Sequence, residues 1–176
     1  MKRINFYDCS LSDLNIDMQE LNLLLGYGNH TPGDDILHMI NDIIGELENH
    51  IRPHCGYILS EGYVADKEHI IINDISLNPG RIITSAMRDA EYYALFTATI
   101  GEGFDNWMKA LKVSDDIVKV FIADALGSVL AEATVTWLMK RLEEEANAEN
   151  LLISNNYSPG YCDWLLIEQR KLFSLF

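Results

Sequence analysis

The chain has 176 residues, 48% of them hydrophobic, and a formal net charge of −14. This length and composition favour one folded domain with a substantial core over a disordered chain. The acidic balance argues against binding to nucleic acid or to an anionic membrane surface, because both need clustered Lys and Arg. No apolar run follows Lys2 and Arg3 as in a signal peptide, and none reaches the length of a membrane span. Three well-separated cysteines suggest reduced thiols, so we predict a single cytoplasmic domain over residues 1–176.

The first third of the chain predicts two helices. Residues 1–16 mix polar and apolar positions, and we expect an irregular or short extended arm there. Asp17 is placed to cap a helix that ends at Gly26, with Glu20 as its capping-box partner. A second helix is expected from residue 34 or 35 until Pro53 ends it. Its apolar residues recur at helical spacing at Ile36, Ile40, Ile43, Leu47 and Ile51.

Beyond residue 56 the hydrophobic period shortens to that of strands. The segments 57–65 and 69–77 predict a hairpin, and a short helix through Ile83 is expected after it. Residues 92–100 are dense in β-prone apolar side chains and predict a central strand. Gly101 and Gly103 then break the strand, and we expect a short helix that ends near Leu111.

The longest predicted helix begins after Ser114, which we expect to cap it, and runs to about Asn147. Its middle is apolar almost all round, which indicates a buried central element. Glu132 falls on the apolar bearing of this helix, which it shares with Val118, Ala125, Val129 and Thr136. A buried carboxylate costs several kcal/mol unless it is paired, so we expect a partner, either a neighbouring loop or a ligand.

The order of these elements predicts an α+β fold. Helices, a hairpin, a strand and a long helix follow one another without the βαβ alternation of a parallel sheet. We therefore expect helices packed against a mainly antiparallel twisted sheet, with one long central helix.

Residues 155–164 contain the most informative local signal. Pro159 fixes φ for the second position of a turn and Gly160 accepts positive φ at the third, so the chain is expected to reverse there. Tyr157 and Tyr161 flank the bend. Their rings and hydroxyls suit stacking on an adenine and polar contacts, or else ordinary packing under the turn. The small or absent side chains at 158 and 160 let a ligand approach the backbone.

The segments 157–164 and 168–175 resemble the S-adenosylmethionine-binding activation domain of cobalamin-dependent methionine synthase, in its free-standing form. The motif of that family is an arginine, three variable residues and then Gly-Tyr. Here Gly160 and Tyr161 match its end, whereas Asn156 occupies the arginine position. Residues 124–133 are similar to the helix that supplies the family's ligand-contacting glutamate, which would be Glu132.

The resemblance implies S-adenosylmethionine as the ligand and a component of a cobalamin-dependent methyltransferase system, not a self-sufficient catalyst. The cobalamin is carried by a partner, the cobalamin-binding module of methionine synthase or a related corrinoid protein, and a reductant protein is a second implied partner. The implied role is to support reductive remethylation of the corrinoid. The family continues past the position of Phe176 with a segment absent here. The implied ligand contacts are Glu132, Asn156, Tyr157, Ser158, Pro159, Gly160 and Tyr161.

Other interpretations stay open. Asn156 favours an interaction module that has lost S-adenosylmethionine binding and only docks a corrinoid protein. Gly101 and Gly103 resemble the start of a dinucleotide fingerprint or an independent methyltransferase loop, but a third glycine and βαβ repetition are missing, so a strand-to-helix turn is favoured. A zinc site at His50, His54 and Cys55 is disfavoured, because a proline interrupts the helix between the two histidines.

Overall fold

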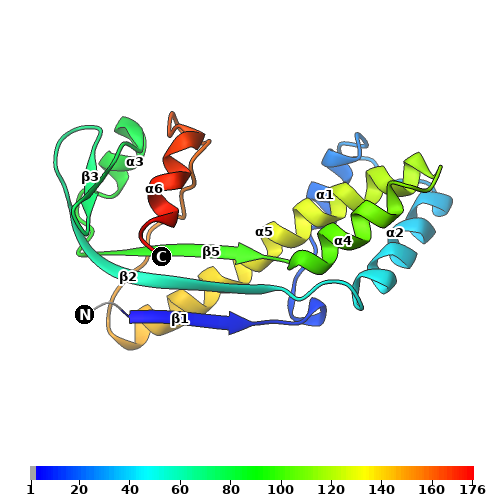
Figure 1. The fold of residues 1–176 in the computed structure, drawn as a ribbon, viewed down its shortest axis with the longest axis horizontal. Coiled ribbons are helices and arrows are strands. Elements are labelled where there is room, and N and C mark those ends of the chain that lie inside the picture. The colour runs from blue at the N-terminus through cyan, green and yellow to red at the C-terminus, as the bar shows by residue number, and fades with distance from the viewer. Residues whose placement is uncertain (1–2) are drawn as a thin grey trace. The chain divides into compact units, whose positions relative to one another are not determined.

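The computed structural model describes residues 3–176 and confirms the α+β fold (Figure 1). The strands are β1 (Arg3–Asp8), β2 (His54–Val64), β3 (Ile70–Ile72), β4 (Ile75–Leu77) and β5 (Tyr92–Thr99). The α-helices are α1 (Met18–Leu24), α2 (Asp34–Leu47), α3 (Gly80–Ala86), α4 (Glu102–Leu111), α5 (Ile117–Ala148) and α6 (Gln169–Phe173). Short 3₁₀ turns occupy Leu11–Asp13 and Leu166–Glu168.

The five strands form one sheet in the order β1-β2-β3-β4, and β5 also pairs with β2. The pairs β2–β3 and β3–β4 are antiparallel, with Gly62 opposite Ile72 and Ile71 opposite Ser76. The segment 92–100 is a strand as predicted, but the central strand of the sheet is β2, which pairs with β1, β3 and β5. At 11 residues β2 is long enough to pair with several strands along its length, whereas β5 pairs with β2 alone in the described residues.

Two further local predictions differ in detail from the structure. Of the two forms expected for the arm over residues 1–16, irregular or short and extended, the extended one is present as strand β1, which gains order by pairing with the distant strand β2. The single strand expected over 69–77 is two short strands joined by a tight turn. Asn73 and Asp74 adopt φ of +48° and +65°, the left-handed conformation that Asn and Asp accept in two-residue hairpin turns.

The described chain divides into two compact units. The helical unit comprises residues 6–55 and 97–140, and the sheet unit comprises residues 3–5, 56–96 and 141–176. Helix α5 contributes residues to both units. The single domain over residues 1–176 stays a prediction.

In the helical unit, α1, α2 and α4 share one hydrophobic core with α5. The Asp17 carboxylate accepts hydrogen bonds from the backbone N–H groups of Gln19 and Glu20, which confirms it as the cap of α1. Two glycines make close helix contacts possible. Gly127 of α5 lies against the Phe104 ring, and Gly103 of α4 lies against the His50 carbonyl oxygen, so neither position has room for a Cβ.

The start of α5 differs from the prediction. Ser114 is not its cap, because its hydroxyl donates to the Leu111 carbonyl and closes the end of α4. Asp116 takes the capping role instead, since its carboxylate accepts from the Lys119 N–H. The long helix itself is confirmed over Ile117–Ala148.

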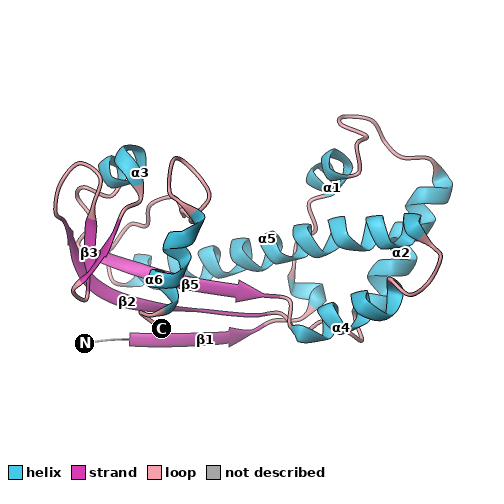
Figure 2. Cartoon of the chain, turned by 45° about the horizontal axis from the view of Figure 1, so that its top comes forward, coloured by secondary structure: helices cyan, strands magenta, loops and turns pink. Residues whose placement is uncertain are grey.

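In the sheet unit, α3 and α6 lie on the same face of the sheet (Figures 1 and 2). The Tyr57 hydroxyl links two further segments, because it donates to Glu145 at 2.6 Å and accepts from Asn5 at 2.6 Å. The core beneath the two helices consists of Ile70, Ile72, Leu77, Ile83, Tyr93, Leu95, Trp164 and Leu175. Across residues 3–176, no helix is both long and apolar enough to span a membrane.

Candidate functional site

The reversal predicted at Pro159 and Gly160 is present. The Tyr161 N–H donates to the Ser158 carbonyl at 3.3 Å, and Gly160 adopts φ of +105°, as a type II turn requires. A second turn follows at once, with the Trp164 N–H bonded to the Tyr161 carbonyl at 2.9 Å. The Gly160 N–H donates to the Trp164 carbonyl at 2.6 Å and ties the two turns together. Residues 158–164 therefore form a compact double turn.

A buried tryptophan anchors this double turn to the sheet unit. Trp164 is only 7% exposed and belongs to the core beneath α3 and α6. The turn also packs on the first residue of α3: a Cβ added to Gly80 would lie 3.3 Å from the Cys162 carbonyl oxygen and 3.5 Å from the Asp163 Cβ. The bend is thus anchored to the core through Trp164, while Gly160 and Tyr161 are exposed to solvent.

The predicted contact residues of the turn differ in exposure. Tyr157, Ser158 and Pro159 are half-buried, and Tyr157 packs against the sheet-unit core. Asn156 and Gly160 are exposed, and Tyr161 is 66% exposed. Packing against the core explains the partial burial of Tyr157, whereas the Tyr161 ring is exposed to solvent. Such a large exposed aromatic ring offers a stacking surface to a ligand.

Glu132 is not buried, contrary to the sequence-based expectation. It lies on the exposed face of α5 with Asp124, Ser128 and Thr136, while Val129 is buried. Glu132 follows Val129 by three residues, which places its side chain about 60° away from that of Val129 around the helix axis. The edge of the buried face of α5 therefore lies between Val129 and Glu132. An exposed carboxylate keeps its hydration and needs no partner within the protein. It remains accessible to a ligand.

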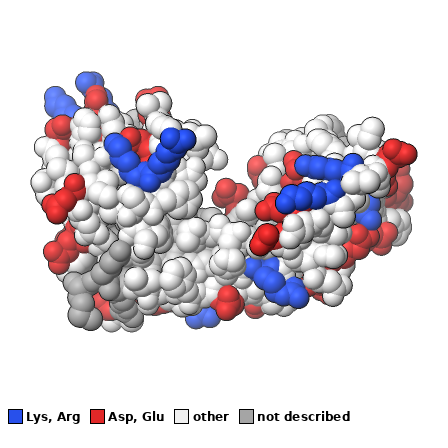
Figure 3. Space-filling model, in the orientation of Figure 1, with Lys and Arg blue, Asp and Glu red and all other residues white. Residues whose placement is uncertain are grey.

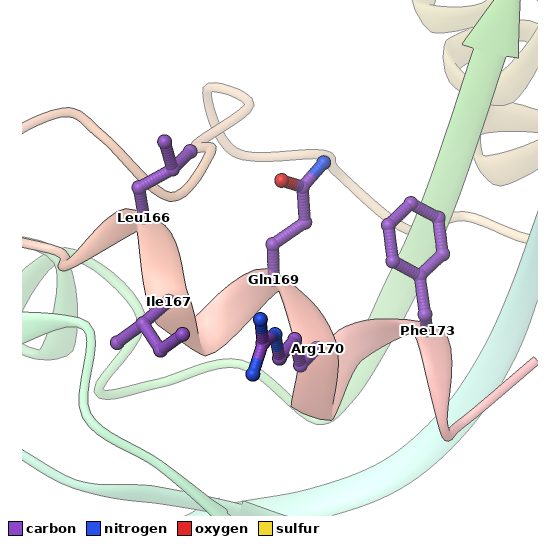
Figure 4. A pocket seen from close by; sticks show the side chains of 5 residues that line it. All are labelled: Leu166, Ile167, Gln169, Arg170 and Phe173. Carbon is purple, nitrogen blue, oxygen red and sulfur yellow. The ribbon is translucent and has the colours of Figure 1, made fainter.

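A shallow hollow of about 280 Å³ lies beside the turn in the sheet unit. It adjoins the bend, because a Cβ added to Gly160 would lie 3.9 Å from Leu166 Cδ1. Figure 4 shows Gln169 and Phe173 projecting from the same side of α6. This hollow was not predicted from the sequence, although the apolar residues that follow the turn were the signal for it. Its lining residues are Leu166, Ile167, Gln169, Arg170 and Phe173.

Glu168 fastens the segment that carries the hollow. Its carboxylate accepts from the Asn78 N–H at 3.0 Å and from the Lys171 ammonium at 2.8 Å. Lys171 also donates to the Ser76 carbonyl at 3.0 Å. Burial acts to raise the pKa of Glu168, but the hydrogen bonds from Lys171 and Asn78 outweigh it and lower the pKa below its ordinary value. The ionised form is therefore the one that the folded state favours.

This lowered pKa gives a pH-dependent contribution to stability. The contribution is fully present above the unfolded-state pKa of Glu168 and is lost as pH falls through the lower folded-state pKa. We expect Glu168→Gln to lower the free energy of unfolding by less than about 1 kcal/mol at pH 7, since water screens the ion pair.

Urea denaturation at pH 7 and at acidic pH measures this effect. The difference between wild type and the variant should shrink on acidification below the ordinary glutamate range. A difference that is constant across pH would contradict the assignment. Glu61→Gln is the control, because the exposed Glu61 shows no such pair within residues 3–176.

The glycines at 101 and 103 have packing roles in the helical unit. Gly101 adopts φ of +91°, and an added Cβ would lie 2.9 Å from the Arg52 carbonyl oxygen, while Gly103 touches the His50 carbonyl. Both observations favour the strand-to-helix turn over a phosphate-binding loop. The His50 ring stacks on Trp107 with a centroid distance of 5.8 Å. Residues 3–176 contain no group of three His, Cys, Asp or Glu side chains placed to hold a metal ion.

No protein-family model and no curated protein matches this chain. Structural comparison gives a different result. A crystal structure of the MetH reactivation domain bound to AdoHcy aligns with a TM-score of 0.72 over 98% of this chain and 69% of the other, at 16% sequence identity. The fold is similar to that of the MetH reactivation domain. At this identity the likeness establishes the fold alone, so the ligand of the MetH reactivation domain enters only as a basis for the proposal below.

Proposed function

We propose that this chain binds S-adenosylmethionine and supports the reductive remethylation of a corrinoid carried by a partner protein. The observation that carries the proposal is the match of 98% of the chain to the MetH reactivation domain, a fold solved with AdoHcy bound. The exposed Tyr161 ring on its rigid Pro-Gly turn adds local support. The proposed contact residues are Glu132, Asn156, Tyr157, Ser158, Pro159, Gly160 and Tyr161.

Each proposed contact has a chemical role. Tyr161 stacks on the adenine, and the backbone around Gly160 lies close to the ligand because no side chain intervenes. Glu132 accepts hydrogen bonds from the amine or the ribose, and its negative charge attracts the sulfonium. Asn156 offers neutral hydrogen bonds, which are about half as strong as the charge-assisted bonds of an arginine.

The protein acts by positioning. S-adenosylmethionine carries the methyl group, and the partner's cobalamin would supply its acceptor, with electrons from a reductant protein. The chain holds the ligand in a fixed orientation, which removes the entropy cost of bringing the reacting groups together. The proposed partner is the cobalamin-binding module of methionine synthase or a related corrinoid protein.

Isothermal titration calorimetry with S-adenosylmethionine tests the proposal. Tyr161→Ala is expected to weaken binding by about tenfold or more, because stacking of a base on an aromatic side chain contributes about 1–3 kcal/mol. Glu132→Gln is expected to weaken binding as well. Tyr63→Ala is the matched control, since Tyr63 is another exposed tyrosine of the sheet unit, at 59% exposure. Absence of binding to the wild-type chain would overturn the proposal.

The alternative is an interaction module that docks a corrinoid protein without binding S-adenosylmethionine. The specific observation in its favour is the exposed, uncharged Asn156 where the resembled motif has an arginine. A silent titration, combined with binding of a purified corrinoid protein to the same chain, would support it.

A further inference from the structure

The hollow beside the Pro-Gly turn contains a cationic side chain without a protein partner. Arg170 lines it together with Leu166, Ile167, Gln169 and Phe173. Within residues 3–176 the Arg170 guanidinium makes no ion pair and no hydrogen bond, and the residue is exposed. Leu166, Ile167 and Phe173 are 65%, 56% and 59% exposed, so apolar surface surrounds this charge. A cation beside apolar walls suits a ligand with both an anionic and an apolar part.

Unpaired cations are scarce in this part of the chain. The net charge is −14, and the segment 149–176 contains only two basic residues, Arg170 and Lys171. Lys171 is already engaged with Glu168 and the Ser76 carbonyl. Figure 3 shows the same tendency on one face, where basic groups lie next to acidic ones and leave broad uncharged areas. Arg170 is therefore the cation of this segment that remains available to an anionic ligand.

A carboxylate-bearing ligand needs such a cation. S-adenosylmethionine and AdoHcy both end in an amino acid whose carboxylate would approach a strongly acidic protein. Asn156 offers no charge to offset the desolvation of that carboxylate, whereas a guanidinium binds carboxylates through two parallel hydrogen bonds. The hollow adjoins the turn through the contact between Gly160 and Leu166. Leu166 and Arg170 line the same hollow, so the hollow that contains Arg170 reaches the turn through Leu166.

We propose that Arg170, in the hollow formed by α6 and the preceding 3₁₀ turn, binds the carboxylate of the adenosyl amino acid and supplies the charge that Asn156 does not. This inference rests on the proposed function. It predicts discrimination by the protein: ligands with the amino-acid carboxylate bind more tightly than adenosyl thioethers without it.

The test compares two ligands by calorimetry on the full chain: AdoHcy, which carries the carboxylate, and 5′-methylthioadenosine, which lacks it. Arg170→Gln is expected to weaken AdoHcy binding by about 10- to 100-fold, the range for a lost hydrogen bond to a charged group. The affinity for 5′-methylthioadenosine should change by less than about twofold, because neutral contacts remain. Arg170→Lys should recover part of the loss, since the charge remains but the two-pronged geometry does not.

Lys171→Gln is the matched control, because it removes the same charge from the neighbouring position. It should leave the ratio of the two affinities unchanged. Circular dichroism confirms that each variant is folded. The inference is overturned if Arg170→Gln leaves AdoHcy binding intact or weakens both ligands equally, while the proposed function survives either result. Failure of the wild-type chain to bind either ligand overturns both.

Discussion

Replacing Gly103 by alanine is expected to destabilise the protein by about 3 kcal/mol, at the upper end of the usual cost of overpacking. The new methyl group would overlap the backbone carbonyl oxygen of His50. His50 lies in the turn that follows α2, and its backbone carbonyl cannot rotate away as a flexible side chain can. The two segments must therefore move apart, and the core contacts of α4 with its neighbours are loosened.

Gly45→Ala is the matched control for this substitution. Gly45 lies on the exposed side of α2, and an added Cβ there would meet no atom within 4 Å. The same chemical change should stabilise the protein by about 0.5–1 kcal/mol, because alanine favours a helix interior more than glycine does. Urea denaturation followed by circular dichroism measures both variants. Equal effects at the two positions would show that the close contact at Gly103 does not constrain the fold.

Trp164→Ala is expected to cost about 3–5 kcal/mol of unfolding free energy, the range for truncating a large buried aromatic residue. Trp164 fills the sheet-unit core and, through its backbone, holds Tyr161 and Gly160 in the double turn. Loss of the ring should also release the turn, so binding of S-adenosylmethionine should weaken together with stability.

Trp164→Phe should cost clearly less than Trp164→Ala. The indole Nε1 is buried without a hydrogen-bond partner in the described residues, so phenylalanine removes a polar group that was already unsatisfied. Leu165→Ala is the control, because its side chain is 67% exposed. Urea denaturation curves for the three variants measure these differences in unfolding free energy. An alanine variant within 1 kcal/mol of wild type would show that the turn does not depend on this anchor.

Much of the local structure was predictable because its causes are local. Asp17 caps α1 through N–H groups two and three residues away. The Pro159–Gly160 reversal likewise needs only the fixed φ of proline and the positive φ of glycine. The prediction for Ser114 was wrong because two acceptable caps lie close together, and the sequence does not say which helix end each one serves.

The candidate site was predictable to a smaller extent. The bend was predicted from the chemistry of Pro159 and Gly160, and its role as a ligand site from the family resemblance. The hollow beside the bend depends on how Leu166 and α6 pack beside Gly160. Glu132 was assigned to a buried face because helical periodicity places it near Val129. Exposure is decided by which neighbours cover each side of α5, and single-helix periodicity does not contain that information.

The sequence by itself determined the α+β class, the cap of α1, the long helix α5 and the sharp bend at Pro159–Gly160, because each follows from backbone preferences and residue spacing within one segment. Only the tertiary structure decided that β1 is a strand, that Gly103 admits no side chain, that Trp164 is the buried anchor and that Arg170 lines a hollow. Each of these depends on contact with residues distant along the chain. Such contacts follow from the packing of the whole fold and not from any local pattern.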